Sequence, residues 1–192
     1  MTSTRSPRTP ATEVRAALIT AGRRILERDG ESALTVRAVA GEARVAPMGV
    51  YNHFDGKDGL LDAVVSDGFE EFARAISTTD SDPLERLFAS GRAYRRFAAS
   101  YPRLYALMFS GRCRPDPAVA ENAFGRFVEV IRYGQAGGII VAGDPADLAL
   151  QVWSCVHGAM SLELMTAQPL TIDATENYEN VLSLIARGVA PG

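Results

Sequence analysis

Every stretch of this sequence with a regular apolar pattern repeats its apolar residues at three- to four-residue spacing, the spacing of an amphipathic helix. Proline, glycine and capping residues separate these stretches, and no segment alternates as a strand does. We therefore expect an all-α protein of about nine helices, the eighth running on to Ala167. Their predicted starts lie near Thr9, Thr35, Ala46, Asp55, Asp82, Tyr101, Asp116, Asp144 and Asp173.

Composition narrows the class of protein. With 192 residues, of which 47% are hydrophobic, the chain is long enough to bury a core and too apolar to be disordered. No apolar run approaches the roughly 20 residues that a membrane helix needs. The polar arm at residues 1–10 lacks the apolar region of a secretion signal, so we expect no membrane association and a cytoplasmic protein.

The chain offers little of what catalysis or metal binding needs. Cys113 and Cys155 lie far apart and outside any metal-binding or redox motif, so we interpret them as ordinary thiols. There are only two histidines, and neither cysteine has an obvious base beside it. No glycine-rich phosphate motif is present. We expect no catalytic residues, no metal and no cofactor, and hence not an enzyme.

Charge is distributed unevenly along the chain. Residues 1–60 hold nine basic and seven acidic side chains, a balance of +2, whereas the remainder holds 11 basic and 16 acidic side chains, a balance of −5. This asymmetry suggests that a polyanionic partner would meet the N-terminal end. A two-charge excess does not by itself indicate nucleic acid.

Residues 34–54, LTVRAVAGEARVAPMGVYNHF, form the most informative segment. The pattern predicts two short helices joined by a tight turn, as in a helix-turn-helix, whose second helix enters the major groove of DNA. An ordinary helical hairpin in a bundle fits the same pattern. The residues expected to face inward are Val39, Ala40, Ala43, Val45, Val50 and Phe54.

This segment resembles the helix-turn-helix of TetR/AcrR-type transcriptional regulators, with a match from about residue 11 to residue 65. Two residues depart from the family pattern: Arg44 stands where glycine is usual, so the turn either accepts left-handed strain or differs slightly, and Ala46 replaces the usual capping serine. The resemblance implies an N-terminal three-helix DNA-binding domain at residues 11–56 and a helical ligand-binding and dimerisation domain at residues 57–192. The matching residues are Thr35, Val39, Ala40, Ala43, Val45, Tyr51, His53, Phe54, Lys57 and Leu60.

The resemblance also implies roles in DNA binding. We expect Thr35, Tyr51, His53 and Lys57 to contact phosphates, and Arg37 to reach a phosphate or a guanine edge. Alternatives remain, since Tyr51 could be a half-buried core residue, His53 a hydrogen-bonding helix end and Lys57 a solvated charge. The full predicted set is Thr35, Val36, Arg37, Arg44, Ala46, Pro47, Met48, Gly49, Tyr51, Asn52, His53 and Lys57, in which Pro47, Met48, Gly49 and Asn52 read bases.

The second half resembles a TetR-type C-terminal domain with a WHG signature, here Trp153, His157 and Gly158, preceded by the segment at residues 101–109. In that subgroup the regulatory helices dimerise and usually enclose a small-molecule pocket. Most aromatic and methionine side chains at helical spacing are core residues, and the Trp153–His157 pair is also explained as a core pair. The candidate ligand contacts are Tyr94, Phe97, Tyr105, Met108, Phe109, Phe127, Trp153, His157 and Met160.

The resulting hypothesis is a one-component transcriptional regulator. It would bind a double-stranded palindromic operator as a homodimer formed through the last two helices, and would act as a repressor controlled by an unknown small-molecule effector. The alternative is a helical bundle that binds a partner protein or an apolar small molecule without DNA. The regulator hypothesis predicts that loss of Arg37, Tyr51 or Lys57 weakens DNA binding, whereas the alternative predicts that their loss has no consequence for function.

Overall fold

The computed structural model describes residues 10–165, 169 and 171–192, and across these residues it contains helices and no strand. The all-α prediction is confirmed. Nearly all of the predicted arm at residues 1–10 and residues 166–167 of the predicted eighth helix lie outside the described residues. That helix ends at Leu164, and Met165 follows it as the C-cap, so the prediction that it continues is wrong at Met165. The elements are α1 (Ala11–Asp29), η1 (Glu31–Ala33), α2 (Val36–Glu42), α3 (Met48–His53), α4 (Gly56–Ile76), α5 (Pro83–Ser100), α6 (Pro102–Met108), α7 (Pro117–Ala136), α8 (Pro145–Leu164) and α9 (Ala174–Gly188).

Four of the long helices have an aspartate as the N-terminal capping residue. The first N–H groups of a helix have no partner within it, and a carboxylate before the helix supplies one. Asp82 accepts from Glu85 N at 2.9 Å, and Asp144 accepts from Ala146 N at 2.7 Å. Asp116 and Asp173 cap α7 and α9 in the same way. The sequence predicted all four starts because these caps are local.

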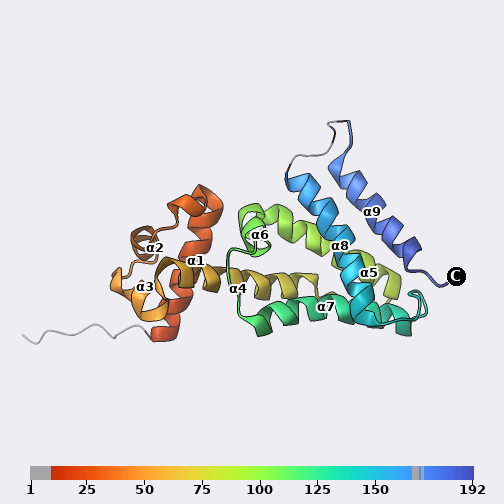
Figure 1. Ribbon diagram of the computed structural model, residues 1–192, viewed down its shortest axis with the longest axis horizontal. Helices are drawn as coiled ribbons and strands as arrows, with labels where there is room; N and C mark the ends of the chain where they lie inside the picture. The colour runs from red at the N-terminus through yellow and green to blue at the C-terminus, as the bar shows by residue number, and fades with distance from the viewer. Residues whose placement is uncertain (1–9, 166–168, 170) are drawn as a thin grey trace, which may run out of the picture.

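The helices divide into two groups joined by α4 (Figure 1). Helices α1–α3 lie at one end and α5–α9 at the other, while α4 packs on α1 as well as on α5 and α7. Helix α4 therefore contributes to the packing of both groups. A Cβ atom added to Gly22 would lie 3.0 Å from Val64 Cγ2, so a larger residue there would require Val64 or the two helices to shift slightly.

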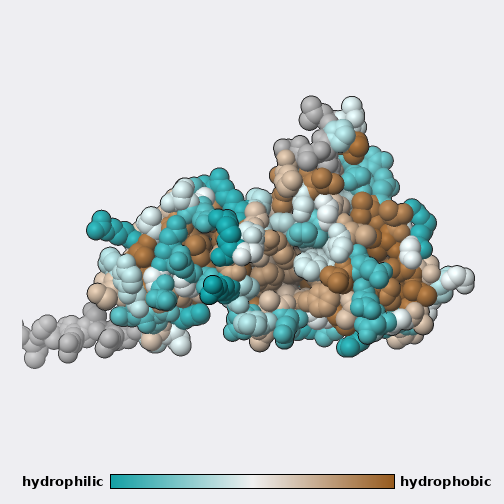
Figure 2. Space-filling model, viewed as in Figure 1, coloured by the Kyte–Doolittle hydropathy of each residue, from teal (hydrophilic) through white to brown (hydrophobic). Residues whose placement is uncertain are grey.

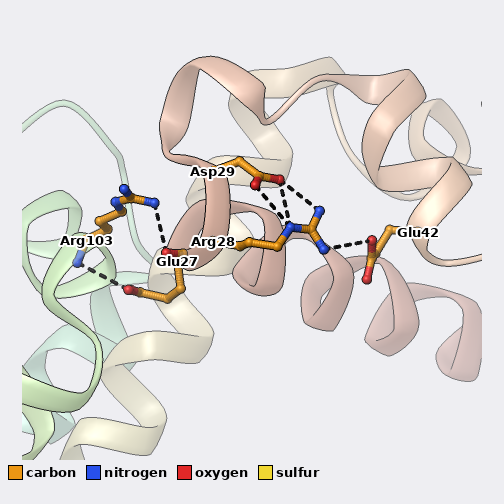
Figure 3. Close-up of polar contacts among 5 residues, drawn as sticks. All are labelled: Glu27, Arg28, Asp29, Glu42 and Arg103. Atoms are coloured by element: carbon orange, nitrogen blue, oxygen red, sulfur yellow. Dashed lines mark hydrogen bonds and ion pairs between the residues drawn. The ribbon is translucent and has the colours of Figure 1, made fainter.

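A second connection between the halves is made by α6 (Figure 3). Glu27 of α1 accepts a hydrogen bond from Leu104 N at 2.6 Å, and the guanidinium of Arg103 donates to the Glu27 carbonyl at 2.8 Å. Glu27 thus caps the start of α6 from another helix. After α6, Arg112 pairs with Glu31 at 2.7 Å, so both ends of α6 are attached to the N-terminal helices.

The outer surfaces of the two halves differ in polarity. Figure 2 shows mostly hydrophilic residues over α1–α3 and a gathering of hydrophobic residues over the α8–α9 end. None of the described helices combines the length and apolar character needed to cross a bilayer. The exposed large apolar residues of α8 and α9 are Leu150, Leu162 and Leu184.

Candidate nucleic-acid interface and a buried aromatic cavity

Helices α2 and α3 are too short to persist alone and are held by packing against α1 and α4. Their anchors are Val39, Ala40 and Val50, all 1% exposed or less, together with Phe54 just after α3. Ala43 and Val45, also expected to face inward, are half-buried and pack on the same core. The packing leaves one face of the helix pair for a partner.

The turn between α2 and α3 is a Schellman motif with arginine at its left-handed position. Val45 N donates to Ala40 O at 2.9 Å and Arg44 N donates to Gly41 O at 3.1 Å. Arg44 has a φ of 57°, and it is the only residue other than glycine with a positive φ in the described part of the chain. Of the two outcomes that the sequence left open, the turn therefore accepts the strain.

None of the predicted DNA-contacting residues is buried. Val36, Gly49, His53 and Lys57 are half-buried, and the others are exposed. Met48 is 64% and Tyr51 59% exposed, which contradicts the alternative that Tyr51 is a half-buried core residue. An exposed methionine beside an exposed tyrosine on α3 is typical of a contact surface.

Most polar side chains of this face have no partner in the part of the chain that the structure describes. Among the described residues, the side chains of Arg37, Arg44, Asn52 and Lys57 form no hydrogen bond or ion pair. Thr35 Oγ1 accepts from Ala38 N at 3.2 Å and so caps α2, which leaves its hydroxyl proton free to donate. The face therefore offers donors and positive charge to a partner.

Two arginines of α1, close to this face, are used differently. Arg28, at the end of α1, pairs with Asp29 and reaches Glu42 at 3.5 Å, and these partners raise its pKa (Figure 3). Arg23 joins α1 to α4 through Asp67 and Glu71. The unpaired cations on α2, on α4 and in the turn thus stand apart from cations that hold the fold together.

In the second half, three of the predicted ligand contacts form a closed polar cluster. The hydroxyls of Tyr94 and Tyr105 lie 2.8 Å apart, and each lies 2.8 Å from His157 Nδ1. Burial lowers the pKa of His157 and raises the pKa of Tyr105 to about 12. Burial also raises the pKa of Tyr94, so both tyrosines stay neutral near pH 7 and the cluster is an uncharged hydrogen-bond network.

A cavity of about 180 Å³, partly open to solvent, lies beside this cluster, between α4, α7, α8 and the end of α6. Of the nine predicted ligand contacts, only Phe109, Phe127 and Trp153 line it. Phe97, Met108 and Met160 are buried core residues, which was the alternative to ligand contact that the sequence left open. The aromatic residues that line the cavity without having been predicted are Phe69, Phe72 and Phe124.

Trp153 carries an unsatisfied group beside the polar cluster. Its indole N–H is buried and has no acceptor among the described residues. It approaches Tyr94 closely enough to lower the pKa of that hydroxyl, but without hydrogen-bond geometry. His157 and Trp153 pack edge to face with ring centroids 5.7 Å apart, which confirms that the two share one helix face.

Comparison with known families gives two matches. The family model described as "Bacterial regulatory proteins, tetR family" matches residues 18–64, which include α2 and α3. The model described as "Tetracyclin repressor-like, C-terminal domain" matches residues 87–185, just over half of the chain, which include the cavity's α7 and α8 walls.

Individual proteins are similar over most of the chain. An HTH-type transcriptional regulator of Mycobacterium tuberculosis is 27% identical over 154 residues, covering 74% of this chain and 65% of that protein. The chain thus spans just under two thirds of that relative's length. An uncharacterized HTH-type transcriptional regulator of the same organism is 25% identical over 187 residues, covering 94% of this chain and 83% of that protein.

Solved structures share the fold. A protein of unknown function from Rhodococcus sp. RHA1 has a TM-score of 0.81 at 26% identity, covering 97% of this chain and all of the other. A TetR-family transcriptional regulator from Haemophilus influenzae has a TM-score of 0.69 at 19% identity, covering 96% of this chain and 100% of the other. The second likeness bears on the fold alone.

Proposed function

This chain belongs to the tetR family of bacterial regulatory proteins, and from this membership we propose that it is a transcriptional regulator that binds operator DNA through α2 and α3. The observation that carries the proposal is the exposed face of this helix pair, where Arg37, Arg44 and Lys57 have no partner among the described residues. Family membership also sets the enzyme class aside. A bacterial regulator acts on the chromosome, which lies in the cytoplasm, so we propose that this protein is cytoplasmic.

Roles at the interface follow from the chemistry of each side chain. Thr35, Tyr51, His53 and Lys57 would contact phosphates, which sets the register of the protein on the duplex. Pro47, Met48 and Gly49 bring an apolar surface to thymine methyl groups, and Asn52 would pair with adenine. Arg37 and Arg44 would add contacts to phosphate or guanine, and Val36 and Ala46 would lie against the backbone.

We further propose a homodimer through α8 and α9 that binds a palindromic operator. The support is the outer face of α8, where Leu150, Cys155, Gly158 and Leu162 are exposed without a charged residue among them. Exposed apolar faces of this kind favour association. Two heads related by a twofold axis would meet half-sites separated by about one turn of DNA or a multiple of it.

The ligand response would pass through α6. This helix is capped by Glu27 of α1 at its start, and Phe109 just after its end lines the cavity. A ligand that repositions Phe109 would move the element on which α1 is fixed and shift the spacing of the two heads. Repression with release by the ligand is the simplest form of this coupling, and it rests on the subgroup resemblance.

The test begins with genomic fragments of the source organism mixed with the purified protein at near-physiological salt. We expect a few intergenic fragments that share a palindrome to be retained. Lys57→Ala should then weaken binding and lower the slope of log affinity against log salt by about one unit. Retention without sequence preference, or a slope that does not change, would favour the helical bundle that binds a partner protein or an apolar molecule instead of DNA.

The dimer has its own test in Gly158→Phe. A Cβ atom added to Gly158 would meet no atom of the chain's described part within 4 Å, so we expect the fold to tolerate a larger side chain there while a partner helix would not. Gly125→Phe is the matched control, because Gly125 is also helical and open but lies on α7. We expect only Gly158→Phe to yield monomers in analytical ultracentrifugation. Dimers formed equally by both variants would place the interface elsewhere.

A further inference from the structure

Arg15 of α1 lies at the junction where α3 ends and α4 begins, although it belongs to neither helix. Its guanidinium carbon lies over the ring of Phe54, 5.4 Å from the ring centroid. Phe54 is the C-cap residue of α3 and is 8% exposed. Helix α1 packs on both α3 and α4 and starts at their end of the molecule (Figure 1). A residue of α1 thus reaches the helix-turn-helix from outside the segment that carries the motif.

The other polar residues at this junction are those proposed above to contact phosphates. The rings of His53 and Phe54 are neighbours, with centroids 6.3 Å apart. The Tyr51 ring borders the first residue of α4, where an added Cβ atom would lie 4.0 Å from Tyr51 Cε1. Lys57 is the second residue of α4. The guanidinium of Arg15 therefore joins three side chains that already form one proposed contact with the DNA backbone.

The charge of Arg15 is not neutralised by its own chain. Arg15 is exposed, and it forms no hydrogen bond or ion pair with any described residue. Asp55 and Asp58, the acidic residues on either side of Lys57, pair with neither of the two cations in this part of the structure. Arg23 of the same helix, by contrast, is held by two carboxylates of α4. Arg15 therefore keeps its positive charge available to an anionic partner.

The contact with Phe54 holds Arg15 without using its hydrogen-bond donors. A guanidinium is planar, so one of its faces can lie against a ring while its N–H groups point outwards in the plane. The attraction between the cation and the ring restricts the position of the side chain. The free N–H groups have the fork geometry that matches two oxygens of a phosphate. Phe54 thus presents Arg15 in a form suited to a phosphate.

We propose that Arg15 binds a phosphate of the operator backbone, beside those met by Tyr51, His53 and Lys57, and so extends the DNA interface onto α1. This inference rests on the proposed function and adds a residue that the helix-turn-helix pattern does not contain. Phosphates recur at about 3.4 Å of rise along one strand, so neighbouring cations can meet successive phosphates of that strand. Such a contact fixes the register of the protein and reads no base.

The experiment measures how Arg15→Ala binds a fluorescein-labelled duplex of the palindrome shared by the retained genomic fragments. Fluorescence anisotropy gives the affinity between about 50 and 200 mM salt. We expect the affinity to fall by up to about fivefold for each copy of the chain on the duplex, the effect of one exposed ion pair. The slope of log affinity against log salt should fall by about one unit per copy. Arg15→Lys keeps a charge over the ring and should restore most of the slope.

Arg24→Ala is the matched control. It removes the same charge from another exposed arginine of α1 that has no partner among the described residues. Arg24 follows Arg15 by nine residues, which places it about half a turn round the helix and about 14 Å along it. There it lines a groove between α1 and α4 together with Tyr101, towards the second half of the molecule. We expect its loss to leave the salt slope unchanged.

A purely structural role for Arg15 predicts a different pattern. If Arg15 only covered Phe54, Arg15→Ala would lower the unfolding midpoint in urea and leave the salt slope of the folded protein unchanged. A second measurement locates the contact on the DNA, because a methylphosphonate removes the charge of one phosphate at a time. At one phosphate of each half-site, this replacement should weaken binding of the wild-type protein and have no further effect on Arg15→Ala.

Contrary results distinguish this inference from the proposed function. A salt slope that Arg15→Ala leaves unchanged, an equal loss in Arg24→Ala, or additive effects at every phosphate would overturn the role of Arg15 while operator binding stands. Failure of the wild-type protein to retain any fragment would overturn operator binding itself, and the role of Arg15 with it.

Discussion

The two halves of the molecule use their polar and aromatic side chains in opposite ways. On α2 and α3 the chemistry lies at the surface, where Arg37 and Tyr51 touch little of their own chain. In the second half, Arg95 pairs with Glu163 of another helix at 2.8 Å, and the aromatic groups form much of the core. In the first half a functional residue can therefore be changed without harming the fold, whereas in the second half function and stability depend on the same residues.

The largest effect that this comparison predicts is that of Phe72→Ala. Phe72 is 1% exposed, and its ring lies 5.2 Å from the rings of both Tyr94 and Phe97. Losing it should lower the free energy of unfolding by about 3–5 kcal/mol, the usual cost of removing a buried aromatic side chain. Urea denaturation followed by circular dichroism measures the loss.

Met48→Ala is the matching change on the first half. Met48 is 64% exposed, so its removal should alter the free energy of unfolding by less than about 0.5 kcal/mol. If Phe72→Ala cost as little, the wall of the cavity would not be part of the core, and the contrast between the halves would fail.

A smaller effect separates the two uses of arginine. Arg37→Ala should reduce affinity for the operator about tenfold, since it removes one charged contact, and leave the unfolding midpoint in urea unchanged. Arg28→Ala makes the same change in net charge at an exposed arginine that is already paired with Asp29. Fluorescence anisotropy with a labelled operator should show little loss for Arg28→Ala. Equal losses would mean that overall charge, and not the face of α2 and α3, sets the affinity.

How far the sequence alone predicts each half follows from the range of the interactions involved. Capping by Thr35, Asp82 or Asp144 acts over two or three residues, so the helix starts could be predicted from spacing. The helix-turn-helix is also specified by residues close together in the sequence, and each residue predicted for its DNA-binding face is half-buried or exposed. Whether they contact DNA remains a prediction.

The cavity could not be predicted in this way. Its walls come from α4, the end of α6, α7 and α8, and no local pattern states which face of each helix leaves a gap. The spacing of Phe69 and Phe72 predicts core positions and does not distinguish the wall of a cavity from the rest of the core. No residue near Phe124 in the sequence marks it as a lining residue. The same limit explains why Glu27, which caps α6 from 77 positions away in sequence, was missed.

A smaller effect is expected from Arg44→Gly. The left-handed conformation costs an L-residue about 1–2 kcal/mol, and glycine avoids this cost while losing about 0.5–1 kcal/mol through the greater freedom of the unfolded chain. A net gain of about 0.5 kcal/mol in the free energy of unfolding follows, measurable by urea denaturation. Arg44→Ala removes the same charge but keeps the strain, so it should show no gain. A gain in both variants would trace to charge and not to the backbone at φ 57°.

The smallest effect concerns pH and returns to the second half. Burial lowers the pKa of His157 below its ordinary value of 6.5, so the unfolded chain takes up a proton more readily than the folded one. Stability should therefore be fully present above about pH 6.5 and fall as the pH decreases from there towards the lowered pKa, with a slope below about 1.4 kcal/mol per pH unit, the limit for one proton. The raised pKa values of Tyr94 and Tyr105 keep both hydroxyls neutral over this range, so they add no slope of their own.

His157→Gln is the control for this prediction, because glutamine keeps an acceptor for the tyrosines but does not titrate. Subtracting the pH profile of this variant removes the contribution of the carboxylates. A difference that stays flat below pH 6.5 would mean that His157 is as solvated as the residues on α2 and α3, and the contrast between the halves would then not extend to the polar cluster.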